Sequence, residues 1–117
     1  MTTKPEQKSS YALLVIDVQK EQFEESTPIY KADQLLQNIT FLILKARQEG
    51  VPVFFVQHSA DTYLKLGSDG WQLHPQIQPV AGEPIIHKRH GNSFEGTNLQ
   101  EELIKRGVST VVVTGLV

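Results

Sequence analysis

The sequence predicts an α/β domain with a parallel central sheet wrapped by helices. Apolar runs at residues 12–16, 53–56 and 111–113 are continuous rather than alternating, the pattern of strands buried on both faces of a parallel sheet. Helical patterns separate these runs, and strand–helix alternation with short links is typical of such sheets. We expect the order strand, helix, strand, long loop, strand, helix, strand, with right-handed crossovers.

The first strand is predicted over residues 12–16, and a helix should follow it. Asp33 can cap this helix, and Gly50 should end it because glycine adopts the left-handed conformation without steric cost. The helix is expected to bury apolar residues at helical spacing, namely Leu35, Ile39, Leu42 and Ala46. The second buried strand then covers residues 53–56.

The second half begins with residues 58–83, a long segment without clear periodicity that is either functional or holds short local structure. A short strand at residues 85–86 should follow and run into Lys88. Thr97 and Gln100 form a predicted capping box. The helix after it should bury Leu99, Leu103 and Ile104 and end at Gly107, before the fourth strand at residues 111–113.

The length of 117 residues allows one domain. We expect a flexible N-terminal tail over residues 1–10 and the domain over residues 11–117. Since the fourth strand lies close to Val117, the last strands and helices of the domain are expected to be missing from this chain.

The composition excludes several functional classes. A net charge of −2 gives no reason to expect a nucleic acid or an anionic membrane as a partner. The absence of cysteine rules out disulfides within the 117 residues and fits a reducing, cytoplasmic location. Residues 1–8 are polar and no apolar signal-peptide core follows them.

Two charged residues stand at strand ends, where open α/β sheets bind ligands. Asp17 directly follows the first strand, and Lys88 ends the third. If they share one edge of the sheet, they form a base with a tuned pKa beside a fixed positive charge. The alternatives stay open: Asp17 can simply cap a turn, and Lys88 can be solvated.

The sequence offers weaker support for other functional motifs. The four histidines and the acidic residues show no convincing ligand spacing, so no metal is predicted. The glycines form no dinucleotide or phosphate loop, so no cofactor is predicted. Ser59 and Ser93 lie in no nucleophile elbow. Phe23 and Trp71 either line a pocket or pin loops to the core.

Taken together, several segments resemble the isochorismatase-like cysteine hydrolases. They are LVIDVQ at 14–19, GWQLHP at 70–75, GEPIIHK at 82–88, NSFEGTNL at 92–99 and VVTGLV at 112–117. The resemblance runs from about Tyr11 to the last residue. Each segment alone is weak, but their common order is specific.

The resemblance implies a Rossmann-like parallel sheet flanked by helices on both faces, an Asp-Lys-Cys triad and usually a homo-oligomer. Asp17 matches the aspartate and Lys88 the lysine, and the cysteine is expected beyond residue 117, after the strand ending in Gly115. We assign Gln19, Phe23 and Trp71 to binding a small-molecule substrate. The nicotinamidase branch of the family binds a metal through an Asp-x-His arrangement, where this chain reads QHSAD at 57–61, so no such metal is predicted.

The leading functional hypothesis is a hydrolase of a small C–N amide. One alternative is vinyl-ether hydrolysis of isochorismate with Asp17 as the acid, since some family members with that activity lack the cysteine. Another is a non-catalytic fragment or binding module.

Overall fold

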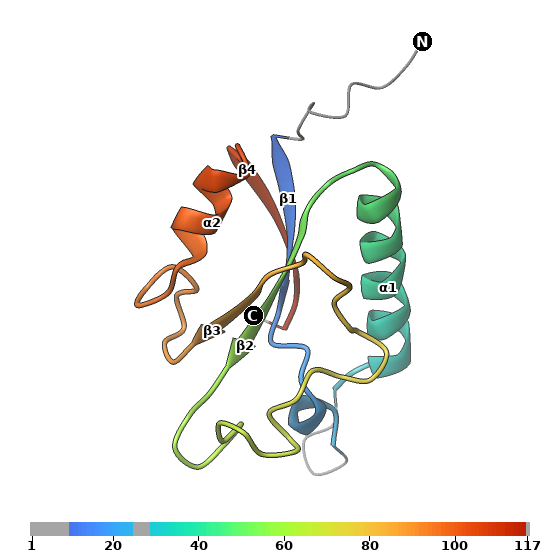
Figure 1. Ribbon diagram of the computed structural model, residues 1–117. Coiled ribbons are helices and arrows are strands. Elements are labelled where there is room, and N and C mark those ends of the chain that lie inside the picture. Colours follow the sequence, from blue (N-terminus) through green and yellow to red (C-terminus); the bar gives the residue numbers. More distant parts are fainter. Residues whose placement is uncertain (1–9, 25–28, 117) are drawn as a thin grey trace.

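The computed structural model describes residues 10–24 and 29–116 and shows a four-stranded parallel sheet (Figure 1). The strands have the order β3-β2-β1-β4. Their bounds are Tyr11–Ile16 for β1, Val53–His58 for β2, Ile85–Lys88 for β3 and Thr110–Gly115 for β4. The helices are α1 (Ala32–Gln48), α2 (Leu99–Lys105) and the short 3-10 helix Lys20–Phe23. The predicted tail lies outside the described residues, except for Ser10.

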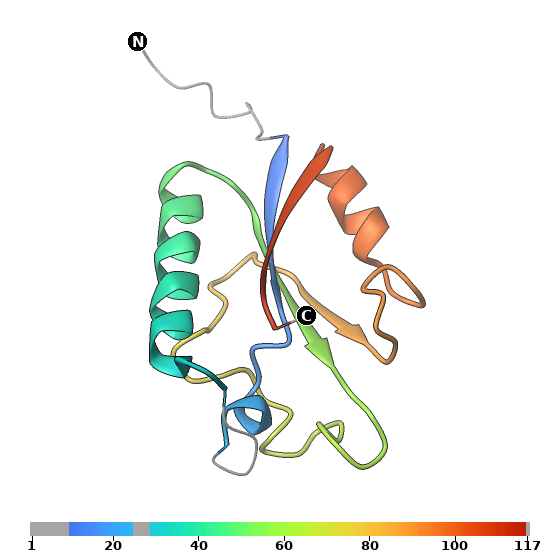
Figure 2. The ribbon, with the colours of Figure 1, turned by 180° about the vertical axis from the view of Figure 1, so that it is seen from behind.

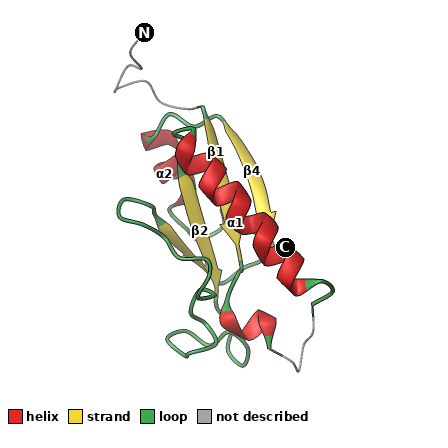
Figure 3. Ribbon diagram, turned by 90° about the vertical axis from the view of Figure 1, so that its right-hand side faces the viewer, coloured by secondary structure: helices red, strands yellow, loops and turns green. Residues whose placement is uncertain are grey.

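The two helices cover opposite faces of the sheet, as the views in Figures 2 and 3 show. Consecutive strand residues therefore point into different cores. Val15 and Phe55 pack with Ile39 of α1, whereas Leu14 and Phe54 pack with Leu99 of α2. Because the central strands β1 and β2 have almost no solvent-facing side, their sequences are continuously apolar. The predicted fold class is confirmed.

Helix α1 begins differently from the prediction. Its N-cap is Lys31 in the left-handed conformation, with φ 50°, and Asp33 lies within the first turn. The buried positions are Leu36, Ile39, Ile43 and Ala46. Leu35 and Leu42 were expected in this stripe but lie at its flank, because two adjacent apolar rows run along the helix and periodicity alone cannot choose between them. Gly50 ends the helix with φ 72°, as predicted.

The predicted capping box of α2 is wrong. The Thr97 hydroxyl donates to the Ser93 carbonyl at 2.6 Å and accepts from the Leu99 N–H at 3.3 Å, so it serves the preceding turn. The helix begins at Leu99 with Asn98 as the N-cap. Ile104 is 67% exposed because the helix buries a narrow stripe through Leu99 and Leu103. Gly107 follows the helix with φ 72°, as expected.

The long segment between β2 and β3 lies on the same side of the sheet as α1 (Figure 1). Leu73 and Ile77 join the α1-side core, and Leu73 forms an isolated antiparallel bridge with Gln19. The segment thus covers the sheet where a crossover helix would otherwise lie. Among the described helices, none is both long and apolar enough to span a membrane.

Candidate active site

Asp17 and Lys88 meet at the carboxyl edge of the sheet. The Lys88 Nζ lies 3.3 Å from Asp17 Oδ1 and donates a hydrogen bond to Oδ2 at 3.4 Å. Asp17 directly follows β1 and Lys88 ends β3, and β2 separates these two strands, so the backbones stand ~10 Å apart. The long lysine side chain spans that distance, and it is only 4% exposed. This is the arrangement expected from the sequence.

The backbone of Asp17 changes direction where β1 ends. Its N–H still donates to the Val56 carbonyl at 2.9 Å, but its φ of 61° is left-handed. Such a φ is uncommon for residues other than glycine, and aspartate tolerates it better than most. At this residue the side chains therefore stop alternating between the two faces of the sheet. Backbone conformations of this kind concentrate at functional sites.

Burial is the main influence on the ionisation of Asp17. It raises the pKa of this carboxyl above its ordinary value, while the charge and hydrogen bond of Lys88, and more weakly His58, act in the opposite direction. Among the described residues, none gives Asp17 Oδ1 a hydrogen bond of good geometry, although Lys88 is close. A carboxylate with a raised pKa is a stronger base than an ordinary aspartate.

His58 is a member of this cluster that sequence reasoning missed. Its Nδ1 lies 3.4 Å from Lys88 Nζ. Burial lowers the pKa of His58, and the nearby Lys88 charge lowers it further, whereas Asp17 raises it. His58 ends β2 and is the register neighbour of Lys88 in β3. Extending the predicted second strand by two residues would have placed the imidazole at this edge.

Gln19 is fully buried and joins three segments. Its Nε2 donates to the carbonyls of His58 at 2.9 Å and Trp71 at 2.8 Å, and its Oε1 accepts from the His58 N–H at 3.0 Å. The amide is thus engaged by backbone groups. The assignment of Gln19 to substrate binding stays a prediction, and so do those of Phe23 and Trp71.

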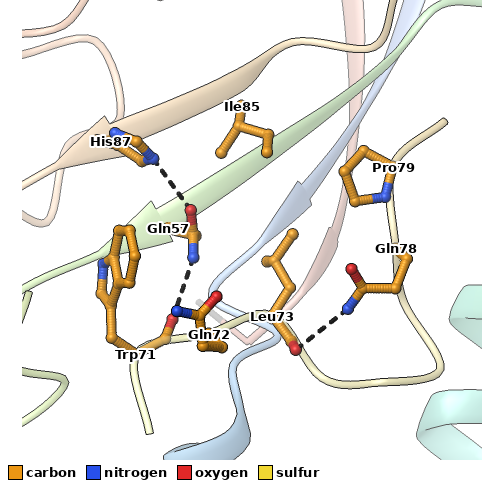
Figure 4. A pocket seen from close by; sticks show the side chains of 8 residues that line it. All are labelled: Gln57, Trp71, Gln72, Leu73, Gln78, Pro79, Ile85 and His87. Carbon is orange, nitrogen blue, oxygen red and sulfur yellow. Dashed lines mark hydrogen bonds between the residues drawn. The ribbon is translucent and has the colours of Figure 1, made fainter. Parts of the chain in front are cut away.

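The two predicted aromatic residues lie in different surroundings. The ring of Phe23 packs edge-on against that of His74, with 5.0 Å between centroids. Trp71 lies beside His87 at the rim of a pocket of about 220 Å³ on the α1 side (Figure 4). Gln57 connects them, because its Oε1 accepts from His87 Nε2 at 3.1 Å and its Nε2 donates to the Trp71 carbonyl at 3.1 Å.

A metal centre has no evident ligand set in the described part of the chain. No group of three or more His, Cys, Asp or Glu side chains there could hold an ion. The predicted absence of a metal remains a prediction.

The fold and the site define a class: a parallel α/β domain with a buried carboxylate–ammonium pair at the carboxyl edge of its sheet. The isochorismatase domain family matches residues 11–117. The chain therefore belongs to the isochorismatase family, which confirms the resemblance seen in the sequence.

Curated relatives extend this match. The chain is 33% identical over 110 residues to the uncharacterized isochorismatase family protein YddQ of Bacillus subtilis, covering 90% of this chain and 61% of the relative. It is also 33% identical over 121 residues to Nicotinamidase 3 of Arabidopsis thaliana, covering 90% of this chain and 58% of that protein. The chain thus spans about three fifths of the length of these relatives.

Solved structures agree in fold. A crystal structure of an isochorismatase family protein superposes with a TM-score of 0.86 at 33% identity, covering 95% of this chain and 66% of the other. N-carbamoylsarcosine amidase from Thermoplasma acidophilum gives a TM-score of 0.82 at 29% identity, covering 90% of this chain and 66% of that structure.

Proposed function

We propose that the protein containing this chain is a hydrolase that cleaves a small C–N amide, with Asp17 and Lys88 in its catalytic site. The observation that carries the proposal is the buried contact between Lys88 Nζ and Asp17 Oδ1 at 3.3 Å. Two similar proteins bear the names of amidases, which supports the choice of bond.

In this mechanism Asp17 is the general base. It takes the proton of a cysteine thiol that lies outside these 117 residues, since they contain no cysteine. The thiolate attacks the amide carbonyl, the tetrahedral intermediate expels ammonia or an amine carrying the transferred proton, and a thioester forms. Water then hydrolyses the thioester and regenerates the thiol. Lys88 keeps the carboxylate oriented and favours the thiolate.

One observation also supports isochorismate hydrolysis as a second candidate. Burial raises the pKa of Asp17, and a raised pKa helps a carboxylic acid to donate a proton. Asp17 would then protonate the vinyl-ether carbon, and water would add to the resulting oxocarbenium ion and lose a proton to the Asp17 carboxylate. The hemiketal would then break its C–O bond and release the ring alcohol and a keto acid. A reactive thiol in the full-length protein, detected by iodoacetamide labelling, would favour the amidase mechanism.

Replacement of Asp17 by asparagine in the full-length protein tests the proposal. We expect Asp17→Asn to lower amide turnover by roughly 10²–10⁴-fold, because the general base is lost while the shape is kept. Turnover is measured as ammonia released from a panel of small amides that includes nicotinamide and N-carbamoylsarcosine. The matched control is Asp69→Asn, an exposed carboxylate paired with Lys20. Near wild-type turnover by Asp17→Asn would refute the assignment.

A further inference from the structure

We propose that His58 is a positioning residue for Lys88: its neutral imidazole accepts a hydrogen bond from the lysine ammonium through Nδ1. The ammonium is then held between Asp17 and His58 rather than by Asp17 alone. This inference rests on the proposed function and adds a residue to that site.

Three strand ends supply the three groups. Lys88 ends β3, His58 ends β2 beside it, and Asp17 follows β1. Lys88 Nζ lies 3.4 Å from His58 Nδ1 and 3.3 Å from Asp17 Oδ1, and the lysine is 4% exposed. A lysine ammonium has several N–H donors and no acceptor. With partners from two other strand ends, this flexible side chain is restricted to a narrow range of positions.

The backbone of His58 is fixed on both sides of the residue. Gln19, fully buried, accepts from its N–H and donates to its carbonyl. The next residue, Ser59, donates its N–H to the Lys88 carbonyl at 3.0 Å. The imidazole therefore reaches Lys88 from a rigid strand end, so the contact is a built feature of the fold and not a surface coincidence.

The protonation state follows from the donor. Because the ammonium only donates, Nδ1 must be unprotonated and the proton of the neutral ring must lie on Nε2. Burial and the charge of Lys88 lower the pKa of His58, with Arg89 and His90 adding to this, while Asp17 opposes them. The ring is then neutral at pH 7, as an acceptor must be.

The first test needs no substrate. Imidazole ¹⁵N correlation spectra of the full-length protein should show the Nε2–H tautomer for His58 and a pKa below 6.5. In Lys88→Met this pKa should rise, because a neighbouring cation has been removed. An Nδ1–H tautomer in the wild-type protein, or an unchanged pKa in Lys88→Met, would overturn the proposal.

The second test separates a hydrogen bond from simple packing. His58→Leu should lower kcat by roughly 10–100-fold, the effect of a lost charge-assisted hydrogen bond, with KM nearly unchanged because His58 acts through Lys88. His58→Asn should restore most of kcat, because its Oδ1 offers an acceptor near the position of Nδ1. The control is His90→Leu, an exposed histidine near Glu95, which should keep wild-type kcat.

The outcomes are distinguishable from failure of the proposed function. If Asp17→Asn is inactive while His58→Leu has wild-type kcat, only the role of His58 is refuted. If His58→Asn is as impaired as His58→Leu, the hydrogen bond is refuted in favour of a packing role. If Asp17→Asn itself stays active, the proposed function fails, and the tautomer and pKa of His58 still decide whether it holds Lys88.

Discussion

At the scale of single residues, the ion pair between Asp17 and Lys88 balances two buried charges. An isolated buried charge is costly, so each group depends on the other. The pKa of Asp17 reflects this balance, because burial raises it and Lys88 limits the rise. The same balance keeps the Asp17 carboxyl ionisable and in a fixed position.

Replacing Lys88 by methionine should therefore raise the pKa of Asp17 further. A carboxyl with a raised pKa in the folded state binds a proton more tightly there than in the unfolded state. Its stabilising contribution is complete below the ordinary value of 3.8 and is lost as the pH rises through the folded-state pKa. Lys88→Met should thus lose more stability between pH 3 and pH 7 than the wild-type protein, by about 3 kcal/mol.

Urea unfolding at the two pH values and a ¹³C carboxyl titration measure these effects. Lys20→Met, which breaks the exposed ion pair with Asp69, is the control and should change little. An unchanged Asp17 titration in Lys88→Met would mean that the two groups are not coupled in solution.

At Gly115, β4 comes very close to the backbone of Ile16, the residue before Asp17. Its φ is 109°, and a Cβ atom would lie 2.2 Å from the carbonyl oxygen of Ile16. Backbone strain alone costs about 1–3 kcal/mol. We expect Gly115→Ala to destabilise the fold by more than this, because the added Cβ also clashes with the main chain of Ile16. The comparison is Gly82→Ala, with φ 90° and nothing within 4 Å.

Thermal denaturation of the two variants measures the difference. If Gly115→Ala and Gly82→Ala lose equal stability, the clash with Ile16 contributes nothing to the loss, and backbone strain explains both variants.

At the scale of elements, Arg47 and Glu83 join α1 to the segment before β3. Arg47 Nε donates to Glu83 Oε2 at 2.9 Å and Nη2 to Oε1 at 2.7 Å, and the Val80 N–H also donates to Oε1. Burial acts to raise the pKa of Glu83, but the hydrogen bonds from Arg47 and Val80, with the charge of Arg47, together lower it. The pair fixes the long segment that covers the sheet beside β3.

Glu83→Gln should cost about 1–2 kcal/mol at pH 7, since the side chains stay partly in water. A lowered folded-state pKa gives stability that is complete above the ordinary value of 4.5 and is lost as the pH falls through the folded-state value. The difference between wild type and variant should therefore shrink by pH 3. Urea unfolding at both pH values checks this, with the exposed Glu49→Gln as control. A difference that persists at pH 3 would assign the effect to packing.

The sequence predicted the elements better than their details. Strands β1 and β2 were predictable because burial on both faces requires a continuous apolar run. Gly50 and Gly107 marked the helix ends because both adopt a left-handed φ. Asp17 and Lys88 were predictable because strand ends of a parallel sheet share an edge. The capping box predicted for α2 was wrong because the Thr97 hydroxyl donates to the Ser93 carbonyl in the preceding turn.

Partners that arise only from tertiary contacts were not predictable. Gln19 meets His58 across 39 residues and Trp71 across 52, and no local pattern records such a contact. The imidazole of His58 was missed for a different reason, because the predicted strand stopped two residues too early.

At the scale of the whole molecule, β4 forms an edge of the sheet. Among the described strands it pairs only with β1, and its Val112 and Val113 are 46% and 50% exposed. An apolar edge strand with unpaired backbone groups is a template for association. We therefore expect the 117-residue chain to self-associate, whereas a defined homo-oligomer of the family type stays a prediction.

Light scattering over a dilution series tests this expectation. The apparent mass should exceed 13.1 kDa at high concentration. Val113→Lys should bring it closer to that value, because a lysine on the edge opposes strand pairing. Val80→Lys is a matched control, since Val80 is 52% exposed but lies in a loop. Both variants change the net charge equally. If Val80→Lys lowers the mass as much, the effect comes from overall charge, and the edge of β4 is not the contact.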